Sequence, residues 1–293
     1  DIDGKDRKLI LTDIGAHEQK IPSLDLAVKE IPAIMCQGSS DVFVKIRNEG
    51  LLNIDSCKLL LEVSTNGNTF NSLATVRFGG KLASSKDTLL RLGAFTFNRL
   101  NTYYFRVKLD KPNGKNDSLS YNDQLISLNS GRLNGSYTIG GSSPDFTTID
   151  SAFIWLSKFG ICGPVRLLLR PGTYNEQITI KQIPGAGISK SVKLTPDPTY
   201  TGKAVIRYNA TNNSLNWVVR FLNASFVQID SLNLQALNSQ FGNVVVFERG
   251  NRNIILSNDS MKTSYDSIYN TECTIISNRN FKQASNYNIT INN

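Results

Sequence analysis

The sequence predicts an all-β chain in which a sandwich of short strands precedes a stack of strand repeats. Three observations support this fold class. Alternating apolar runs of strand length, separated by turn residues, fill residues 22–130. A single amphipathic helix at residues 148–159 then leads into short strands. Similar strand-like segments return between residues 226 and 293, which is the signature of a repeat architecture.

Five runs in the first part alternate apolar and polar residues with the period of a β-strand. They are DLAVKE (25–30), DVFVKIR (41–47), CKLLLEV (57–63), DTLLRLG (87–93) and TYYFRVKL (102–109). Turn pairs such as Asn66-Gly67 and Gly79-Gly80 separate them, so we expect a β-sandwich of about seven strands. Two runs have one apolar face each. These faces are Val42, Val44 and Ile46, and Tyr103, Phe105 and Val107.

Three segments of this part carry a family resemblance. They are DLAVKEI (25–31), VKIRNEG (44–50) and YYFRVKLDKPNGKNDSLSYND (103–123). They resemble the CARDB-type modules of bacterial cell-surface proteins, in which an Asn-x-Gly turn follows the second strand. The resemblance implies an immunoglobulin-like β-sandwich over residues 21–131, acting as a spacer or adhesive domain without catalysis.

Local signals define the helix that opens the second part. Thr148 is placed to cap it, and Ser151 three residues on completes a weak capping box. Gly160 is a natural helix stop. The residues at helical spacing between them are apolar and predict one buried stripe. They are Ile149, Ala152, Phe153 and Leu156.

The stretches DFTTIDSAF (145–153) and PGTYNEQITI (171–180) carry a second resemblance. They resemble the start of right-handed parallel β-helices of the pectin-lyase-like superfamily, and are most similar to the pectin methylesterase-like start. The resemblance implies a right-handed parallel β-helix over residues 132–293, incomplete at its C-terminal end, with an N-terminal capping helix. Such a helix covers the strand edges and apolar interior at the open end of a stack.

Strand-like repeats extend through the rest of this part. FVQIDSLNL (226–234), RNIILSND (252–259) and YNITINN (287–293) recur at spacings of about 26 and 34 residues. In the first of them we expect alternating inward residues with a kink near Ser231. The many asparagines near the C-terminus fit either turns or internal asparagine stacks, and turn formation is the interpretation we favour.

Residues 1–20 resemble the closing edge of a preceding β-helix domain, because DIDGKDR followed by DIGAHE is similar to the last coil of bacterial β-helices. Asp1, Asp3 and Asp6 are spaced closely enough to suggest a calcium loop. The loop lacks the distal Glu of an EF-hand, so a plain turn is the favoured interpretation. No other cofactor is expected.

No catalytic residue is identified. His17 is the only histidine and lies far from any nucleophile motif. The catalytic stretches of pectin methylesterases and polygalacturonases are missing. Asp230 and Asp259 could align on neighbouring coils as a carboxylate pair, although a structural role is the simpler interpretation. Trp155 and Trp217 are candidate sugar platforms, and we expect Trp155 to be packed on the capping helix.

The four cysteines, Cys36, Cys57, Cys162 and Cys273, contain no C-x-x-C pair, so a zinc site is not expected. If residues 41–47 and 57–63 are hairpin partners, Cys36 and Cys57 lie about 20 Å apart, which is beyond disulfide reach. The cysteines alone therefore leave the compartment open.

The chain has a formal net charge of +8 from basic residues that are scattered singly. This favours a solvated basic surface, with acidic polysaccharide as the alternative partner and no nucleic acid. No apolar run is long enough to insert into a membrane.

Asp-Ser/Thr-apolar triplets occur more often than average composition predicts. The triplet resembles the O-glycosylation signal of secreted Bacteroidetes proteins, with ordinary turn chemistry as the alternative. Ser151, in the predicted helix, is a poor acceptor. The candidate O-glycosylation residues are Thr88, Ser118, Ser231, Ser260 and Ser267.

These patterns predict a non-catalytic structural or adhesive segment of a large modular protein, extracellular or associated with the outer membrane. A Bacteroidetes-type chain exported by type IX secretion, serving attachment or gliding and contacting neighbouring domains of the same chain, would fit. One alternative is a carbohydrate-active β-helix enzyme, a lyase, esterase or hydrolase, with its active site beyond residue 293. The other is a glycan-binding module.

Overall fold

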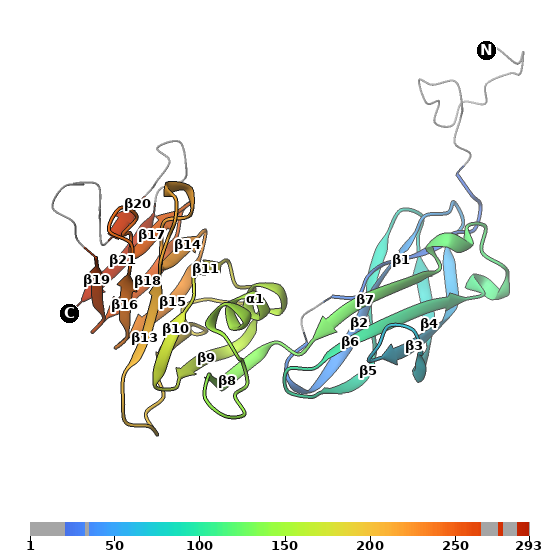
Figure 1. Cartoon of the computed structure of the whole chain (residues 1–293). Coiled ribbons are helices and arrows are strands. Elements are labelled where there is room, and N and C mark those ends of the chain that lie inside the picture. Colours follow the sequence, from blue (N-terminus) through green and yellow to red (C-terminus); the bar gives the residue numbers. More distant parts are fainter. Residues whose placement is uncertain (1–20, 33–34, 265–274, 278–285, 293) are drawn as a thin grey trace, which may run out of the picture. The chain divides into compact units, whose positions relative to one another are not determined.

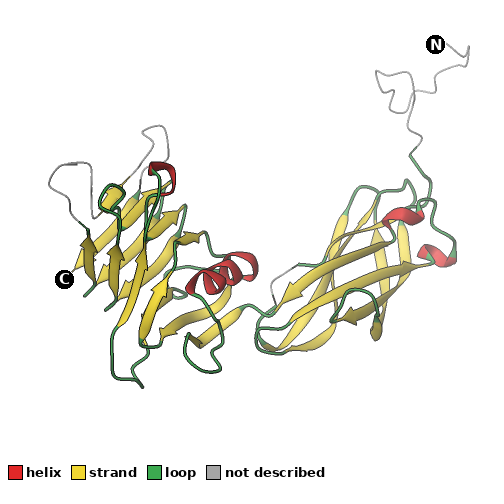
Figure 2. Cartoon of the chain, in the orientation of Figure 1, coloured by secondary structure: helices red, strands yellow, loops and turns green. Residues whose placement is uncertain are grey.

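The computed structural model describes residues 21–32, 35–264, 275–277 and 286–292 (Figure 1). These residues form two compact units. The sandwich unit comprises the described residues up to 35 together with 39–96 and 102–129, and the parallel unit comprises 36–38, 97–101 and 130 onwards. Strands dominate both units (Figure 2). No helix among the described residues is both long and apolar enough to cross a membrane.

The sandwich unit consists of two sheets. One has three strands in the order β1-β2-β5, and the other has four in the order β4-β3-β6-β7. This order, in which the fifth strand returns to the first sheet, is that of immunoglobulin-like sandwiches. The strands are β1 (Leu26–Glu30), β2 (Gly38–Asn48), β3 (Ile54–Ser64), β4 (Asn71–Leu82), β5 (Asp87–Phe97), β6 (Thr102–Asp110) and β7 (Gln124–Ser130).

The apolar faces expected from the sequence form the core of the sandwich. All six residues of the two faces on β2 and β6 are buried, as the alternation predicted. The Asn-x-Gly turn that follows β2 is also ordered by its own side chain. The Asn48 amide donates to the carbonyl oxygens of Leu52 and Leu82, and the Gly50 N–H donates to Asn48 Oδ1. A Cβ on Gly50 would lie 2.6 Å from the Asp25 nitrogen, so only glycine fits there.

The assumed hairpin between residues 41–47 and 57–63 is wrong. β2 pairs with β1 and β5, whereas β3 pairs with β4 and β6 in the other sheet. Residues 71–82, the actual hairpin partner of β3, were not expected as a strand because Gly79-Gly80 was interpreted as a turn. That turn is wrong, since both glycines lie inside β4, whose alternating Ala74, Val76 and Phe78 are half-buried.

The parallel unit contains three parallel sheets. The chain adds one strand to each sheet in turn and then returns to the first sheet. One sheet has six strands in the order β21-β18-β15-β12-β9-β8, and the others are β10-β13-β16-β19 and β11-β14-β17-β20. We call the last of these the β11 sheet. From β9 onwards, three consecutive strands contribute one strand to each sheet. The strands of the six-stranded sheet are β8 (Leu133–Ile139), β9 (Ile161–Leu169), β12 (Val192–Pro196), β15 (Ser225–Asp230), β18 (Arg252–Ser257) and β21 (Tyr287–Asn292). The others are β10 (Gly172–Asn175), β11 (Ile178–Lys181), β13 (Ala204–Tyr208), β14 (Val219–Leu222), β16 (Asn233–Ala236), β17 (Val245–Glu248), β19 (Ser260–Thr263) and β20 (Ile275–Ser277).

The strand repeats expected from the sequence are neighbours in the six-stranded sheet. Val227 of β15 lies beside Ile254 of β18, which lies beside Ile289 of β21. The kink at Ser231 is confirmed by its positive φ of 60°, and residues on both sides of it point inward. These inward residues are Val227, Ile229, Leu232 and Leu234, all buried.

Stacking of like side chains fills the interior of the parallel unit. Phe221 of β14 and Phe247 of β17 stack with ring centroids 5.1 Å apart and planes 9° apart. Their separation matches the spacing of neighbouring strands, about 4.8 Å, because each ring occupies the same position in successive turns. Register between strands therefore dictates the packing of the core.

Asparagine side chains form ladders between turns of the stack, while Asn258 and other asparagines adopt the left-handed backbone typical of turns, so both interpretations apply. Asn216 Oδ1 accepts from the Asn243 N–H at 3.0 Å, and both residues are buried. Asn251 lies in a turn, but its Oδ1 accepts from the Ala224 N–H one layer away, and its N–H donates to Asn286 Oδ1. An amide both donates and accepts, so it satisfies backbone groups that the turns leave unpaired.

The helix α1 (Ile149–Phe159) forms as its local signals predicted. Thr148 Oγ1 accepts from the Ser151 N–H at 3.1 Å, and Ser151 Oγ approaches the Thr148 N–H at 3.3 Å, which completes the capping box. The Glu176 carboxylate accepts from the next two free N–H groups, those of Ile149 and Asp150. The predicted stripe is buried, with Phe159 added to it.

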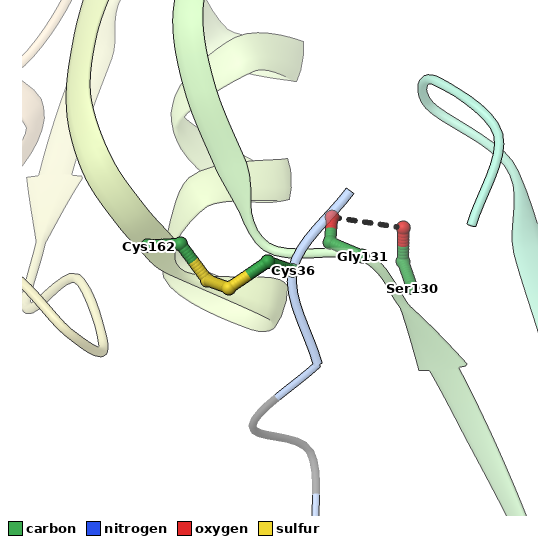
Figure 3. Close-up of a disulfide and its surroundings, with 4 residues drawn as sticks. All are labelled: Cys36, Ser130, Gly131 and Cys162. Carbon is green, nitrogen blue, oxygen red and sulfur yellow. Dashed lines mark hydrogen bonds between the residues drawn. A yellow bond between two sulfur atoms is a disulfide. The ribbon is translucent and has the colours of Figure 1, made fainter. Parts of the chain in front are cut away.

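The disulfide bond joins Cys36 to Cys162 (Figure 3). Their Cα atoms are 5.8 Å apart, and the bond closes a loop across 126 positions of sequence. Cys57 is a buried free thiol, and burial raises its pKa to about 11. No local signal in the sequence connects Cys36 to a strand so far along the chain, so a bridge to Cys57 was the only pairing considered there and the pairing with Cys162 was not expected.

Two short segments, residues 36–38 and 97–101, lie between sandwich residues in the sequence but belong to the parallel unit. The Gln37 N–H donates to the Arg132 carbonyl oxygen, and Gln37 Oε1 accepts from the Tyr137 hydroxyl at 2.6 Å. Arg99 donates two hydrogen bonds to the Asp145 carboxylate, at 2.7 and 2.6 Å, and covers the Tyr137 ring at 4.1 Å. Charge-assisted bidentate pairs of this kind fix geometry as well as adding stability.

Replacing Thr148 by Ala should lower the free energy of unfolding by about 1 kcal/mol, because the Ser151 N–H loses its acceptor. Urea unfolding followed by circular dichroism would measure the change. Thr147, which is exposed and adjacent, provides the matched control, and Thr147→Ala should stay within about 0.5 kcal/mol of the wild type. Equal effects at the two positions would contradict the capping role.

The double variant Cys36→Ala/Cys162→Ala should be less stable than the oxidised wild type by about 3–5 kcal/mol, because the unfolded chain regains the freedom of a long loop. Thermal unfolding with and without reductant would measure it. Reductant should lower the Tm of the wild type to that of the variant and leave the variant unchanged. A variant as stable as the oxidised protein would show that the bond contributes nothing.

Candidate functional site

A surface hollow of about 550 Å³ lies at the end of the β11 sheet. It is bounded by α1 on one side and by the last residues and following turns of β11, β14 and β17. We call it the β11-sheet hollow. Its lining residues are Ser157, Lys181, Gln182, Leu222, Asn223 and Arg249.

Strand register places the two cations of the hollow on one line. Lys181 ends β11 and lies beside Leu222, which ends β14 and lies beside Glu248 of β17. Arg249 follows Glu248 directly. Since Lys181 and Arg249 are separated by two strand spacings, their backbones are about 10 Å apart. The hollow thus presents two positive charges in a row, with amide groups between them.

No carboxylate among the described residues neutralises these cations. Both side chains are exposed, and neither forms an ion pair in the described part of the chain. The nearest acid along the chain, Glu248, is already paired with Arg220 at 3.6 Å, and Arg220 in turn covers the Trp217 ring at 3.9 Å. The hollow is therefore suited to an anionic ligand.

The backbone at Arg249 is strained. Its φ is 63°, in the left-handed region that glycine and asparagine tolerate and long side chains seldom adopt. The corresponding turn one layer away begins with Asn223, at φ 52°. An arginine at this position gives up stability that an asparagine would retain.

Asp230 and Asp259 come close but do not form a matched pair. Asp230 lies beside Ser257, so Asp259 is offset along the turn. Burial raises the pKa of Asp230, but hydrogen bonds from Lys193, Ser257 and Asn258 outweigh it and lower the pKa to about 2. Burial raises the pKa of Asp259 to about 6. Asp259 Oδ1 accepts from the Leu232 N–H, while its buried Oδ2 has no hydrogen-bond partner.

The candidate glycosylation residues do not gather in one place. Thr88, in β5, is half-exposed, and Ser118 is exposed in the sandwich unit. Ser231 and Ser260 are exposed at one turn of the parallel unit, in neighbouring layers. Ser267 lies outside the described residues. The Ser151 hydroxyl donates to the Thr148 carbonyl oxygen, which agrees with its exclusion as an acceptor.

Both tryptophans are packed, so neither offers a sugar platform. Trp155 lies against the core of the parallel unit and contacts Phe146 and Phe159, with ring centroids 6.4 and 4.6 Å away. Trp217 is 3% exposed.

Four carboxylates of the sandwich unit lie near one another. Asp117 Oδ2 accepts from the Leu26 N–H, and Asn122 donates to both Asp25 and Glu49. Burial, with smaller contributions from Asp117 and Asp25, raises the pKa of Asp123 to about 6. No group of three or more His, Cys, Asp or Glu among the described residues is arranged for a metal ion. Asp1, Asp3, Asp6 and His17 lie outside the described residues.

The chain matches no protein-family model and no curated protein. Among solved structures it is similar to a CARDB domain of a Pyrococcus furiosus protein, determined in complex with di-metal ions. That match has 17% identity and a TM-score of 0.31, and covers 41% of this chain and 99% of the domain. A domain of a Methanosarcina acetivorans protein described as a cell surface protein matches with 21% identity and a TM-score of 0.33, covering 39% of this chain and 96% of that domain.

A β-galactosidase from Bacteroides fragilis is similar over more of the chain. It has 10% identity and a TM-score of 0.23, and the match covers 78% of this chain and 42% of that protein. Similarities of this strength concern the fold at most. They transfer no activity, metal or partner to this chain.

Asp259→Asn should stabilise the protein by roughly 2 kcal/mol at pH 7, because the amide keeps the bond to Leu232 and removes a buried charge. The folded pKa of about 6 lies above the ordinary carboxyl value of 3.8, so the wild type loses stability as the pH rises from about 4 to 6. The difference between variant and wild type should therefore be small near pH 4 and reach its full size above pH 6. Urea unfolding across this range measures it, and a difference independent of pH would contradict the assignment.

Proposed function

We propose that the chain is a structural and adhesive segment of a modular extracellular or cell-surface protein. The disulfide between Cys36 and Cys162 carries this proposal. Disulfides persist in oxidising compartments and are rare in the cytosol, so the bond supports an extracytoplasmic location. The sandwich unit supports a spacer or adhesive role because it has the immunoglobulin-like strand order that many cell-surface domains share.

The parallel unit is consistent with a right-handed parallel β-helix that starts with a capping helix. Rotation of the chain through three parallel sheets, the stacked Phe221 and Phe247 and the asparagine ladders all support this assignment. Right-handed crossover is the rule for parallel strands in one sheet. A stack of this kind suits a stalk, because each turn pairs its backbone with the next.

The proposal includes a specific setting. The Asp-Ser/Thr-apolar triplets suggest a secreted Bacteroidetes-type glycoprotein, exported by type IX secretion to the outer membrane and used in attachment or gliding. Exposed hydroxyls at Ser118, Ser231 and Ser260 are accessible to a glycosyltransferase. The turn interpretation of the same triplets predicts that these hydroxyls carry no glycan.

Non-reducing peptide mapping by mass spectrometry would test the proposal on protein isolated from the producing cells. We expect a cross-linked peptide joining Cys36 to Cys162, an alkylatable Cys57, and glycan mass on peptides that contain Ser118, Ser231 or Ser260. Surface labelling of intact cells should modify the protein. Reduced Cys36 and Cys162 in a chain protected from surface labelling would overturn the extracellular assignment, and bare serines would remove the glycoprotein part alone.

A further inference from the structure

We propose that the β11-sheet hollow binds a polyanionic polysaccharide, with Lys181 and Arg249 contacting successive carboxylate or sulfate groups. This inference deepens the proposed adhesive function by naming a binding site and a ligand class. It rests on that function only for the extracellular setting of the ligand.

The chemistry of the lining supports an anionic ligand that also carries hydroxyl groups. Two unpaired cations supply the charge recognition, about two strand spacings apart. Asn223, Gln182 and Ser157 provide donors and acceptors for hydroxyls. Leu222, between the two cations, offers a small apolar surface for the C–H face of a sugar ring. The hollow is open to solvent, so a ligand longer than the hollow can extend beyond it.

The backbone at Arg249 is a second feature of the hollow, although Leu100, Lys111 and Phe226 adopt the same left-handed conformation elsewhere. The turn one layer away has Asn223 at its left-handed position, which is the residue type that stability alone favours. Arg249 holds its own left-handed conformation although its guanidinium has no ion-pair partner within the described chain. Strained residues cluster at ligand-binding sites, and here the strained residue lines the hollow.

The extracellular setting favours a polysaccharide over a nucleic acid as the polyanion. The lining has no aromatic ring on which a base could stack, and both tryptophans of the chain are packed elsewhere. Amide and hydroxyl groups are suited to sugars instead.

The test compares binding of the full chain to immobilised alginate, dextran sulfate, neutral dextran and duplex DNA. Alginate presents carboxylates and dextran sulfate presents sulfates, so the two identify the anionic group. The double variant Lys181→Gln/Arg249→Asn removes both cations. The matched control, Lys190→Gln/Lys203→Gln, removes the same charge from two exposed lysines outside the hollow.

We expect the wild type to bind at least one polyanionic polysaccharide more tightly than dextran or DNA, and salt to weaken that binding. The hollow variant should bind about tenfold more weakly, and the control within about twofold of the wild type. Arg249→Asn alone should raise Tm while weakening binding, because asparagine tolerates the left-handed backbone.

Four results would each overturn the proposal. They are failure of the wild type to bind either polyanionic polysaccharide, equal losses in the two double variants, DNA binding as tight as polysaccharide binding, and a lower Tm for Arg249→Asn. The disulfide mapping above is independent of all four. Failure of the binding proposal alone, in a surface protein whose hollow binds no polysaccharide, is therefore distinguishable from failure of the extracellular assignment.

Discussion

Backbone hydrogen bonds between successive parallel strands set the position of every side chain in the parallel unit. Because each strand is held in register with the one before it, a residue type repeated at the right interval forms a column. Phe221 and Phe247 stack in this way, as do the asparagines of the turns. The same register brings Lys181 and Arg249 to one edge, although they are far apart in sequence. The core and the candidate site therefore depend on one set of hydrogen bonds.

The features that could be predicted from the sequence are those whose causes are local. The helix at Ile149–Phe159 has its cap, its stripe and its stop within thirteen consecutive residues, and all three formed as expected. The buried faces of β2 and β6 likewise follow from alternation within a single strand. In each case the pattern and the structure that it produces lie in the same short segment.

Pairings between distant segments could not be predicted in this way. The partner of Cys36 depends on the path of the chain between it and Cys162, and that path is set by tertiary packing. The strand partner of β3 was missed because Gly79-Gly80 was interpreted as a turn, whereas both glycines lie within β4. The β11-sheet hollow was missed for a related reason. Its cations become neighbours only when the lengths of the intervening turns are known, and those lengths vary from layer to layer.

Asp259 and Arg249 are both in unfavourable positions, but for different physical reasons. Asp259 holds a carboxyl group in an apolar interior, where its neutral form is favoured. Arg249 instead holds a charged group in water on a backbone that disfavours it. The first arrangement affects stability as a function of pH, whereas the second leaves a charge available at the surface. Only the second can take part in recognition.

The disulfide has a mechanical consequence for a chain under tension. A pull applied to residues before 36 and after 162 passes through the sulfur atoms and bypasses everything between them. While the bond is intact, the 126 positions of sequence that it spans cannot be extended, and their contour length is roughly 400 Å. Within the sandwich, β1 lies outside the closed loop while β2 to β7 lie inside it, so force would reach β1 and spare the other six strands. Reduction of the Cys36–Cys162 bond would allow the same pull to unfold and extend the residues between the two cysteines.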